Sequence, residues 1–187
     1  MLYVLENAGY FSQIIVQPED FRKLTHLIIP GVGFIRSITE EIDSISGLRE
    51  EIINFCKLGN PVLGICLGMQ LLGIESEEDS SAVCLDIFDF KTENLSKVIK
   101  TNSVPHIGWN QVNHNQNSKL FKGIPNKSDF YFSHSYAILS SKYSISTTNF
   151  EIDFISAVNS DNIYGVQFHP ERSQKFGIKL LENFLSL

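Results

Sequence analysis

The chain has 187 residues, of which 43% are hydrophobic and 19% are charged, and its formal net charge at pH 7 is −6. This composition fits one globular domain over residues 1–187 and excludes an intrinsically disordered chain. The negative charge, with no run rich in Lys and Arg, argues against nucleic-acid binding.

The cysteines and the N-terminal residues indicate the cellular compartment of the protein. Cys56, Cys66 and Cys84 show no C-x-x-C spacing, so they predict neither a disulfide framework nor a zinc site. The first basic residue is Arg22, which leaves no charged start for a signal peptide, and no apolar run approaches the length of a bilayer span. We therefore expect a cytoplasmic protein with no membrane association, no metal and no cofactor.

The first third of the chain alternates between helical and strand patterns. Apolar spacing and turn residues predict, in order, the end of a helix at residues 1–9, strands at 13–17 and 26–29, and helices at 37–45 and 48–58. Pro30-Gly-Val-Gly33 is glycine-rich, but it is not G-x-G-x-x-G and lacks the Walker lysine. It therefore does not favour a phosphate-binding loop.

The stretch from Pro61 to Leu72 predicts a buried strand that breaks at Cys66 and continues as a helix. Gly64-Ile-Cys-Leu-Gly68 has the spacing of a nucleophile elbow, and its glycines suit a turn too tight for a Cβ. At a helix N-terminus, free N–H groups favour a thiolate and can hold an oxyanion. An inert core cysteine is the alternative, and this motif alone does not separate the two.

The second half of the chain predicts mostly strands. Expected elements are short strands and turns at 84–101, strands at 130–136 and 163–168, and an amphipathic helix at 177–187. The acidic run Glu75–Asp79 is most simply a solvated loop or helix end. Gly108-Trp109-Asn110 is expected in a loop, which suits either packing or a partner surface. Helices among the early strands and few among the later ones indicate an α/β sheet with an antiparallel extension.

His169-Pro170-Glu171 follows the last predicted strand directly. If the proline keeps the backbone extended, His169 and Glu171 point the same way, and the carboxylate can orient the imidazole as a base. A surface His-Pro-Glu can be purely structural. With an elbow cysteine elsewhere in the chain, we favour a triad of nucleophile, base and orienting group formed by Cys66, His169 and Glu171.

Six segments, in this order, resemble the class I (triad) glutamine amidotransferases, and within them the HisH-type glutaminase subunits of imidazole glycerol phosphate synthase. They are Leu27-Ile-Ile-Pro-Gly-Val-Gly33, Gly64-Ile-Cys-Leu-Gly-Met-Gln-Leu-Leu72, Ser76-Glu-Glu78, Val104-Pro-His-Ile-Gly-Trp-Asn-Gln-Val112, Phe130-Tyr-Phe-Ser-His-Ser-Tyr136 and Gly165-Val-Gln-Phe-His-Pro-Glu171. The elbow and the His-Pro-Glu are common to triad amidotransferases. The fourth and fifth segments are narrower and point to the HisH branch.

The resemblance implies an open, largely parallel sheet flanked by helices, with an antiparallel extension. It also implies that Cys66 attacks the carboxamide of L-glutamine, that His169 transfers protons and that Glu171 orients the ring. An oxyanion loop, formed by Gly31, Val32 and Gly33, and the N–H of Leu67 would stabilise the tetrahedral intermediate. The products would be glutamate and ammonia.

Further residues are assigned by the same resemblance. Residues expected to bind glutamine are Gln70, Glu78, His134, Ser135 and Tyr136. The partner would be a (β/α)8-barrel cyclase, in a heterodimer that passes ammonia into imidazole glycerol phosphate on the histidine pathway. Residues expected to face it are Trp109, Asn110 and Arg172.

Three features depart from the family pattern. The family opens with a strand ending in Asp-x-Gly-x-Gly-Asn and a whole helix, whereas this sequence starts near the end of that helix, so we expect an N-terminally short domain without the first strand. The usual glycine-rich stretch after Glu78 is absent, and Arg172 replaces a usual lysine. Two alternatives stay open: a paralogue that supplies ammonia for surface-sugar amidation, and a truncated, inactive interaction subunit.

Overall fold

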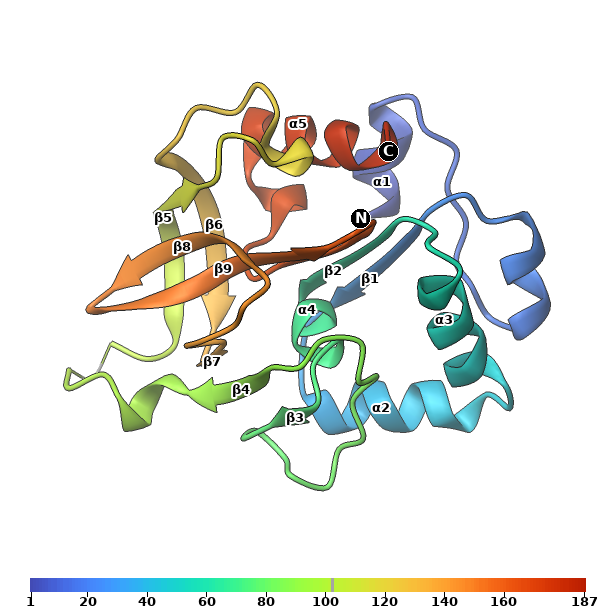
Figure 1. The fold of residues 1–187 in the computed structure, drawn as a ribbon, viewed down its shortest axis with the longest axis horizontal. Coiled ribbons are helices and arrows are strands. Elements are labelled where there is room, and N and C mark those ends of the chain that lie inside the picture. Colours follow the sequence, from blue (N-terminus) through green and yellow to red (C-terminus); the bar gives the residue numbers. More distant parts are fainter. Residues whose placement is uncertain (102) are drawn as a thin grey trace.

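The chain folds into a mixed sheet flanked by helices (Figure 1), and the structure, a computed structural model, describes residues 1–101 and 103–187. The helices are α1 Leu2–Asn7, α2 Ile35–Ser44, α3 Leu48–Lys57, α4 Leu67–Leu71 and α5 Gln174–Leu185. The strands are β1 Leu27–Gly31, β2 Val62–Cys66, β3 Glu75–Ser76, β4 Lys91–Asn94, β5 His106–His114, β6 Ser128–His134, β7 Tyr136–Ala137, β8 Ser144–Phe150, β9 Ile152–Ser160 and β10 Ile163–Val166.

The main sheet has seven strands in the order β1-β2-β10-β9-β8-β5-β6, and a second sheet has the order β3-β4-β7. In the main sheet β1, β2 and β10 are parallel, and the four remaining strands continue it as an antiparallel extension. The predicted α/β class with an antiparallel extension is confirmed. Two of the parallel strands, β1 and β2, lie in the helix-rich first part of the chain, because parallel strands need a crossover connection that a helix can provide.

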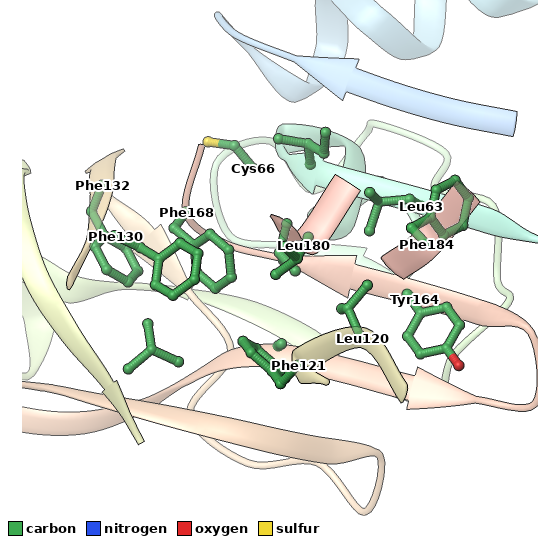
Figure 2. Close-up of a cluster of buried hydrophobic side chains, with 14 of the residues drawn as sticks. Leu63, Cys66, Leu120, Phe121, Phe130, Phe132, Tyr164, Phe168, Leu180 and Phe184 are labelled. Atoms are coloured by element: carbon green, nitrogen blue, oxygen red, sulfur yellow. The ribbon is translucent and has the colours of Figure 1, made fainter. Parts of the chain in front are cut away.

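Two apolar clusters hold the parallel strands from opposite faces. Leu63 and Ile65 of β2 pack with α1, α5 and the phenylalanines of β6, whereas Val62 packs with α2 and α3. Figure 2 shows the first cluster, with Cys66 at its border. This period-2 division buries all five residues of β2, so the strand that ends at Cys66 is covered on both faces.

Most of the predicted elements of the first third are confirmed, namely the helix end at α1, the strand at β1 and the helices α2 and α3. The strand predicted at residues 13–17 is wrong, because this segment has no regular structure. Its β-branched residues Ile14 and Val16 are 67% and 62% exposed. A strand needs a partner for its backbone groups, and among the described strands β1 pairs with β2 alone.

The outer edge of β1 faces an apolar groove. Leu27 N–H donates to Pro61 O on the β2 side, so by alternation the N–H and C=O of Ile28 point toward the groove, and the described chain offers them no partner. The groove has a volume of about 770 Å³ and is lined by α1, residues 10–15, β1, α2 and α3. Two buried polar atoms of its lining, Ser12 Oγ and His26 Nε2, also lack a hydrogen-bond partner within residues 1–101 and 103–187.

Among the residues that the structure describes, no helix has the length and apolar character to cross a membrane.

Candidate active site

Cys66 lies where β2 ends and α4 begins, so the predicted strand, elbow and helix are confirmed. Its backbone has φ +53° and ψ −109°, a region that residues with a Cβ rarely adopt. Such strain is typical of a nucleophile elbow, which presents the side chain at the top of the sheet. The elbow therefore places the Cys66 sulfur at the carboxyl edge of the parallel strands.

The glycines around Cys66 allow three backbones to meet. A Cβ on Gly64 would lie 2.6 Å from Gly68 O, and a Cβ on Gly68 would overlap the carbonyl oxygen of Ile29. Gly31 is the register partner of Cys66, and a Cβ there would lie 2.7 Å from Leu67 Cβ. The predicted oxyanion loop therefore starts beside the nucleophile.

His169 reaches the same edge because β10 is the parallel neighbour of β2. Its Nδ1 lies 2.8 Å from Glu171 Oε1, so this nitrogen donates to the carboxylate and leaves Nε2 free for proton transfer. The expected extended backbone is wrong. Pro170 instead opens a 3-10 turn, Pro170–Arg172, because its fixed φ suits the first position of a helical turn.

The His-Pro-Glu turn is attached to β6 by hydrogen bonds of the main chain and of the Ser173 hydroxyl. His169 N–H donates to Tyr131 O at 2.8 Å, Ser173 Oγ donates to His169 O at 2.6 Å, and Tyr131 N–H donates to Ser173 Oγ at 3.0 Å. These bonds fix the backbone of His169, and the bond from Nδ1 to Glu171 orients its ring.

The pKa of His169 links the three predicted triad residues. His169 is 3% exposed, and burial alone lowers its pKa, but interactions with Cys66 and Glu171 outweigh burial and raise the pKa to about 9. Burial raises the pKa of Glu171, yet its hydrogen bond to His169 brings the net shift below the ordinary value. The structure thus brings a sulfur, an imidazole and a carboxylate into one electrostatic cluster.

Three of the five expected substrate-binding residues, Gln70, His134 and Tyr136, are joined by hydrogen bonds that lead through Gln167 to Cys66. Gln70 Nε2 donates to Tyr136 O at 3.1 Å, and His134 Nδ1 donates to the same oxygen at 2.8 Å. Ser135 O accepts from Leu95 N–H at 3.0 Å. Burial, with a smaller contribution from His106, lowers the pKa of His134 to about 3, so this ring is neutral. His134 and the amide nitrogen of Gln70 are therefore engaged within the protein.

Glu78, the fifth, lies at the start of α2. Its Oε2 accepts from Ile35 N–H at 2.6 Å, where the helix dipole favours a carboxylate. This position is two residues beyond the oxyanion loop. Its contact with the ammonium of glutamine stays a prediction, since one oxygen already caps the helix.

The residues expected to face a partner separate into two environments. Trp109 lies in β5 and not in a loop, so that expectation is wrong; its side chain is 48% exposed and its ring meets Tyr131 edge-on at 6.0 Å. Arg172 stacks over the same Tyr131 ring at 4.3 Å. Asn110 instead uses its Nδ2 on Asn149 O, at 2.9 Å, and His106 Nε2, at 3.3 Å.

Sequence reasoning missed Gln167, which is fully buried and donates from Nε2 to Cys66 Sγ at 3.6 Å. The available signal was one polar residue inside the apolar run Val166–Phe168, directly before His169. It also missed His106, whose ring stacks on Phe132 and Phe150.

Residues 7–187 match the family model described as glutamine amidotransferase class-I, so the chain belongs to this family. The fold agrees with solved structures. The chain aligns with a crystal structure of a glutamine amidotransferase at a TM-score of 0.75 and 16% identity, covering 99% of this chain and 90% of that one. The glutaminase domain of Trypanosoma brucei CTPS with bound acivicin gives 0.66 and 13% identity, covering 98% and 84%.

Within the family the chain is of the HisH type. It is 42% identical to imidazole glycerol phosphate synthase subunit HisH of Buchnera aphidicola, over 98% of this chain and 90% of that protein. It is 43% identical to the HisH subunit of Pyrococcus furiosus, over 96% of this chain and 89% of that protein.

Proposed function

We propose that this chain is the glutaminase subunit of an imidazole glycerol phosphate synthase and hydrolyses L-glutamine to glutamate and ammonia through Cys66, His169 and Glu171. One observation carries the proposal: parallel pairing of β2 with β10 puts the elbow cysteine and the His-Pro-Glu turn at one sheet edge. The raised pKa of His169, which interacts with both other residues, supports it. The names of the HisH relatives support the choice of ammonia acceptor.

Acylation begins when the Cys66 thiolate attacks the side-chain carbonyl carbon of glutamine. The resulting oxyanion accepts hydrogen bonds from Leu67 N–H and from the oxyanion loop, each worth roughly 2.7–4 kcal/mol in the transition state. His169 gives its Nε2 proton to the amide nitrogen, the C–N bond breaks, and ammonia leaves. The product is a γ-glutamyl thioester on Cys66.

Deacylation reverses the roles of His169. Its neutral Nε2 takes a proton from water, whose oxygen attacks the thioester carbon, and the C–S bond breaks to release glutamate and regenerate the thiolate. Glu171 holds the ring by its Nδ1 throughout, which keeps Nε2 directed at the reacting atoms.

Two oxygen acceptors are proposed for the amino-acid head of glutamine. Both N–H groups of Gln70 are engaged by the protein, which leaves its carbonyl oxygen for the substrate ammonium. Glu78 retains its second carboxylate oxygen for the same charge. His134, Ser135 and Tyr136 are the further residues proposed to surround the bound glutamine.

The ammonia would pass to a (β/α)8-barrel cyclase in a heterodimer. Trp109 and Arg172, which both contact Tyr131 beside the His-Pro-Glu turn, form the surface proposed to meet this partner. Half-exposed aromatic and arginine side chains are typical of protein interfaces.

The test uses the complex with its cyclase, supplied with glutamine. Cys66→Ala is expected to lower glutamine hydrolysis by at least about 10³-fold, because the covalent route is lost. Cys56→Ala is the matched control: burial raises the pKa of Cys56 to about 11, so it stays a thiol on α3, and activity should be unchanged.

Mass spectrometry after treatment with a glutamine-mimicking electrophile should locate the label on Cys66 alone. Equal turnover by the native chain and Cys66→Ala, or a label on another residue, would overturn the proposal and favour an inactive interaction subunit.

A further inference from the structure

A fully buried amide next to the nucleophile has no part in the reaction described above. Gln167 directly follows β10, and its main-chain N–H donates to Ser156 O at 2.9 Å. Its side chain lies between Cys66 and Gln70. A buried side-chain amide costs free energy unless each of its groups is hydrogen-bonded. Its orientation therefore follows from its neighbours.

The orientation of the Gln167 amide is determined by the main-chain carbonyl of Tyr136, to which it is connected through two hydrogen bonds of Gln70. Tyr136 O can only accept, so the Gln70 atom at 3.1 Å from it is the amide nitrogen. The second hydrogen of this nitrogen is directed at Gln167, 3.1 Å away, so the Gln167 atom there must be its oxygen. The Gln167 nitrogen then faces the Cys66 sulfur at 3.6 Å.

A line of neutral histidines fixes the same carbonyl from the other side. His134 Nδ1 donates to Tyr136 O, so its Nε2 accepts from His106 Nδ1 at 3.0 Å, and His106 Nε2 accepts from Asn110 Nδ2 at 3.3 Å. Burial lowers the pKa of His106 to about 4, so each ring carries one proton, as this direction requires. Reversing the Gln167 amide would place its nitrogen 3.1 Å from the Gln70 nitrogen, with a donor on each side and no acceptor between them.

The two protonation states of Cys66 have different partners. As a thiol it donates to Ser133 O, 3.8 Å away, and this carbonyl cannot stabilise a thiolate. As a thiolate it accepts from the Gln167 side-chain N–H and also interacts with the His169 ring, which is bonded in turn to Glu171. A donor of this kind stabilises only the charged form of the sulfur.

We propose that Gln167 is a positioning residue for the proposed glutaminase reaction: its N–H holds the Cys66 sulfur as a thiolate in the elbow, and its oxygen turns the Gln70 carbonyl toward the substrate. Only the role of Gln167 toward the Gln70 carbonyl rests on the proposed function. The link to Cys66 is testable without glutamine.

The test measures the rate of Cys66 alkylation by iodoacetamide against pH in the full chain. Gln167→Met removes both hydrogen bonds at similar length, and we expect the pH midpoint of alkylation to rise by about one unit. Gln167→Glu preserves the side-chain shape and replaces the donor by an oxygen, so it should shift the midpoint in the same direction.

Ser128→Ala is the control, because it removes a different hydrogen bond of a buried residue, from Ser128 Oγ to Pro125 O at 2.7 Å, outside the hydrogen bonds that lead to Cys66. Its alkylation profile should match the native one. A native profile in both Gln167 variants overturns the proposal. With the complex, Gln167→Met should also raise KM for glutamine. Loss of the proposed function would appear instead as turnover that survives Cys66→Ala, with the alkylation result intact.

Discussion

Strands β1 and β2 are neighbours in one sheet, yet their surroundings differ. β2 is paired on both sides and buried along its whole length, whereas β1 is paired on one side and faces the apolar groove on the other. The nucleophile Cys66 ends β2, and the predicted oxyanion loop follows at the end of β1. The structure therefore joins a fully buried strand that ends at the nucleophile to a less covered strand that leads into the predicted oxyanion donors.

The largest expected effect lies at the contact between these two strands and α4. Gly68→Ala places a Cβ against the backbone oxygen of Ile29, which cannot move aside, so unfolding free energy should fall by about 3–4 kcal/mol. Urea unfolding followed by Trp109 fluorescence measures it. Gly59→Ala, at φ +78° with open space around it, should cost only about 1 kcal/mol. Equal losses for the two variants would contradict the tight contact.

A smaller expected effect tests the electrostatic interactions of His169 at the carboxyl end of the parallel strands. The pKa of His169 is about 9 in the fold against an ordinary value of 6.5, so its contribution is complete below pH 6.5 and is lost as pH rises through 9. Unfolding free energy should fall by about 2–3 kcal/mol over this interval. His169→Gln should remove most of the slope. A native slope that survives in His169→Gln would place its origin elsewhere.

The smallest effect is expected beside the groove. Ile14→Ser and Val16→Ser alter exposed side chains of a segment without regular structure, so each should change unfolding free energy by less than about 0.5 kcal/mol. Ile65→Val removes one methylene from fully buried β2 and should cost about 1 kcal/mol. If Ile14→Ser proved as costly as Ile65→Val, the contrast between the two strands would be wrong.

Local sequence patterns correctly predicted the elements that are buried along their whole length. The apolar run before Cys66 and the two glycines around it specify a buried strand and a tight turn whatever lies nearby. Patterns failed where a distant partner decides the outcome. Residues 13–17 contain the β-branched apolar run of a strand, but the described chain gives them no strand to pair with. Gly108, at φ +133°, was expected in a loop, and pairing with β6 makes it part of β5.

By itself, the sequence determined the strand-turn-helix at Cys66 and the nearby carboxylate for His169, because both depend on residues a few positions apart. Only the tertiary structure decided that β10 lies beside β2, that Gln167 faces the sulfur and that Asn110 points inward. The reason is that hydrogen-bond partners of buried amides come from strands separated by up to about a hundred residues. No local pattern records which donor meets which acceptor until the sheet has formed.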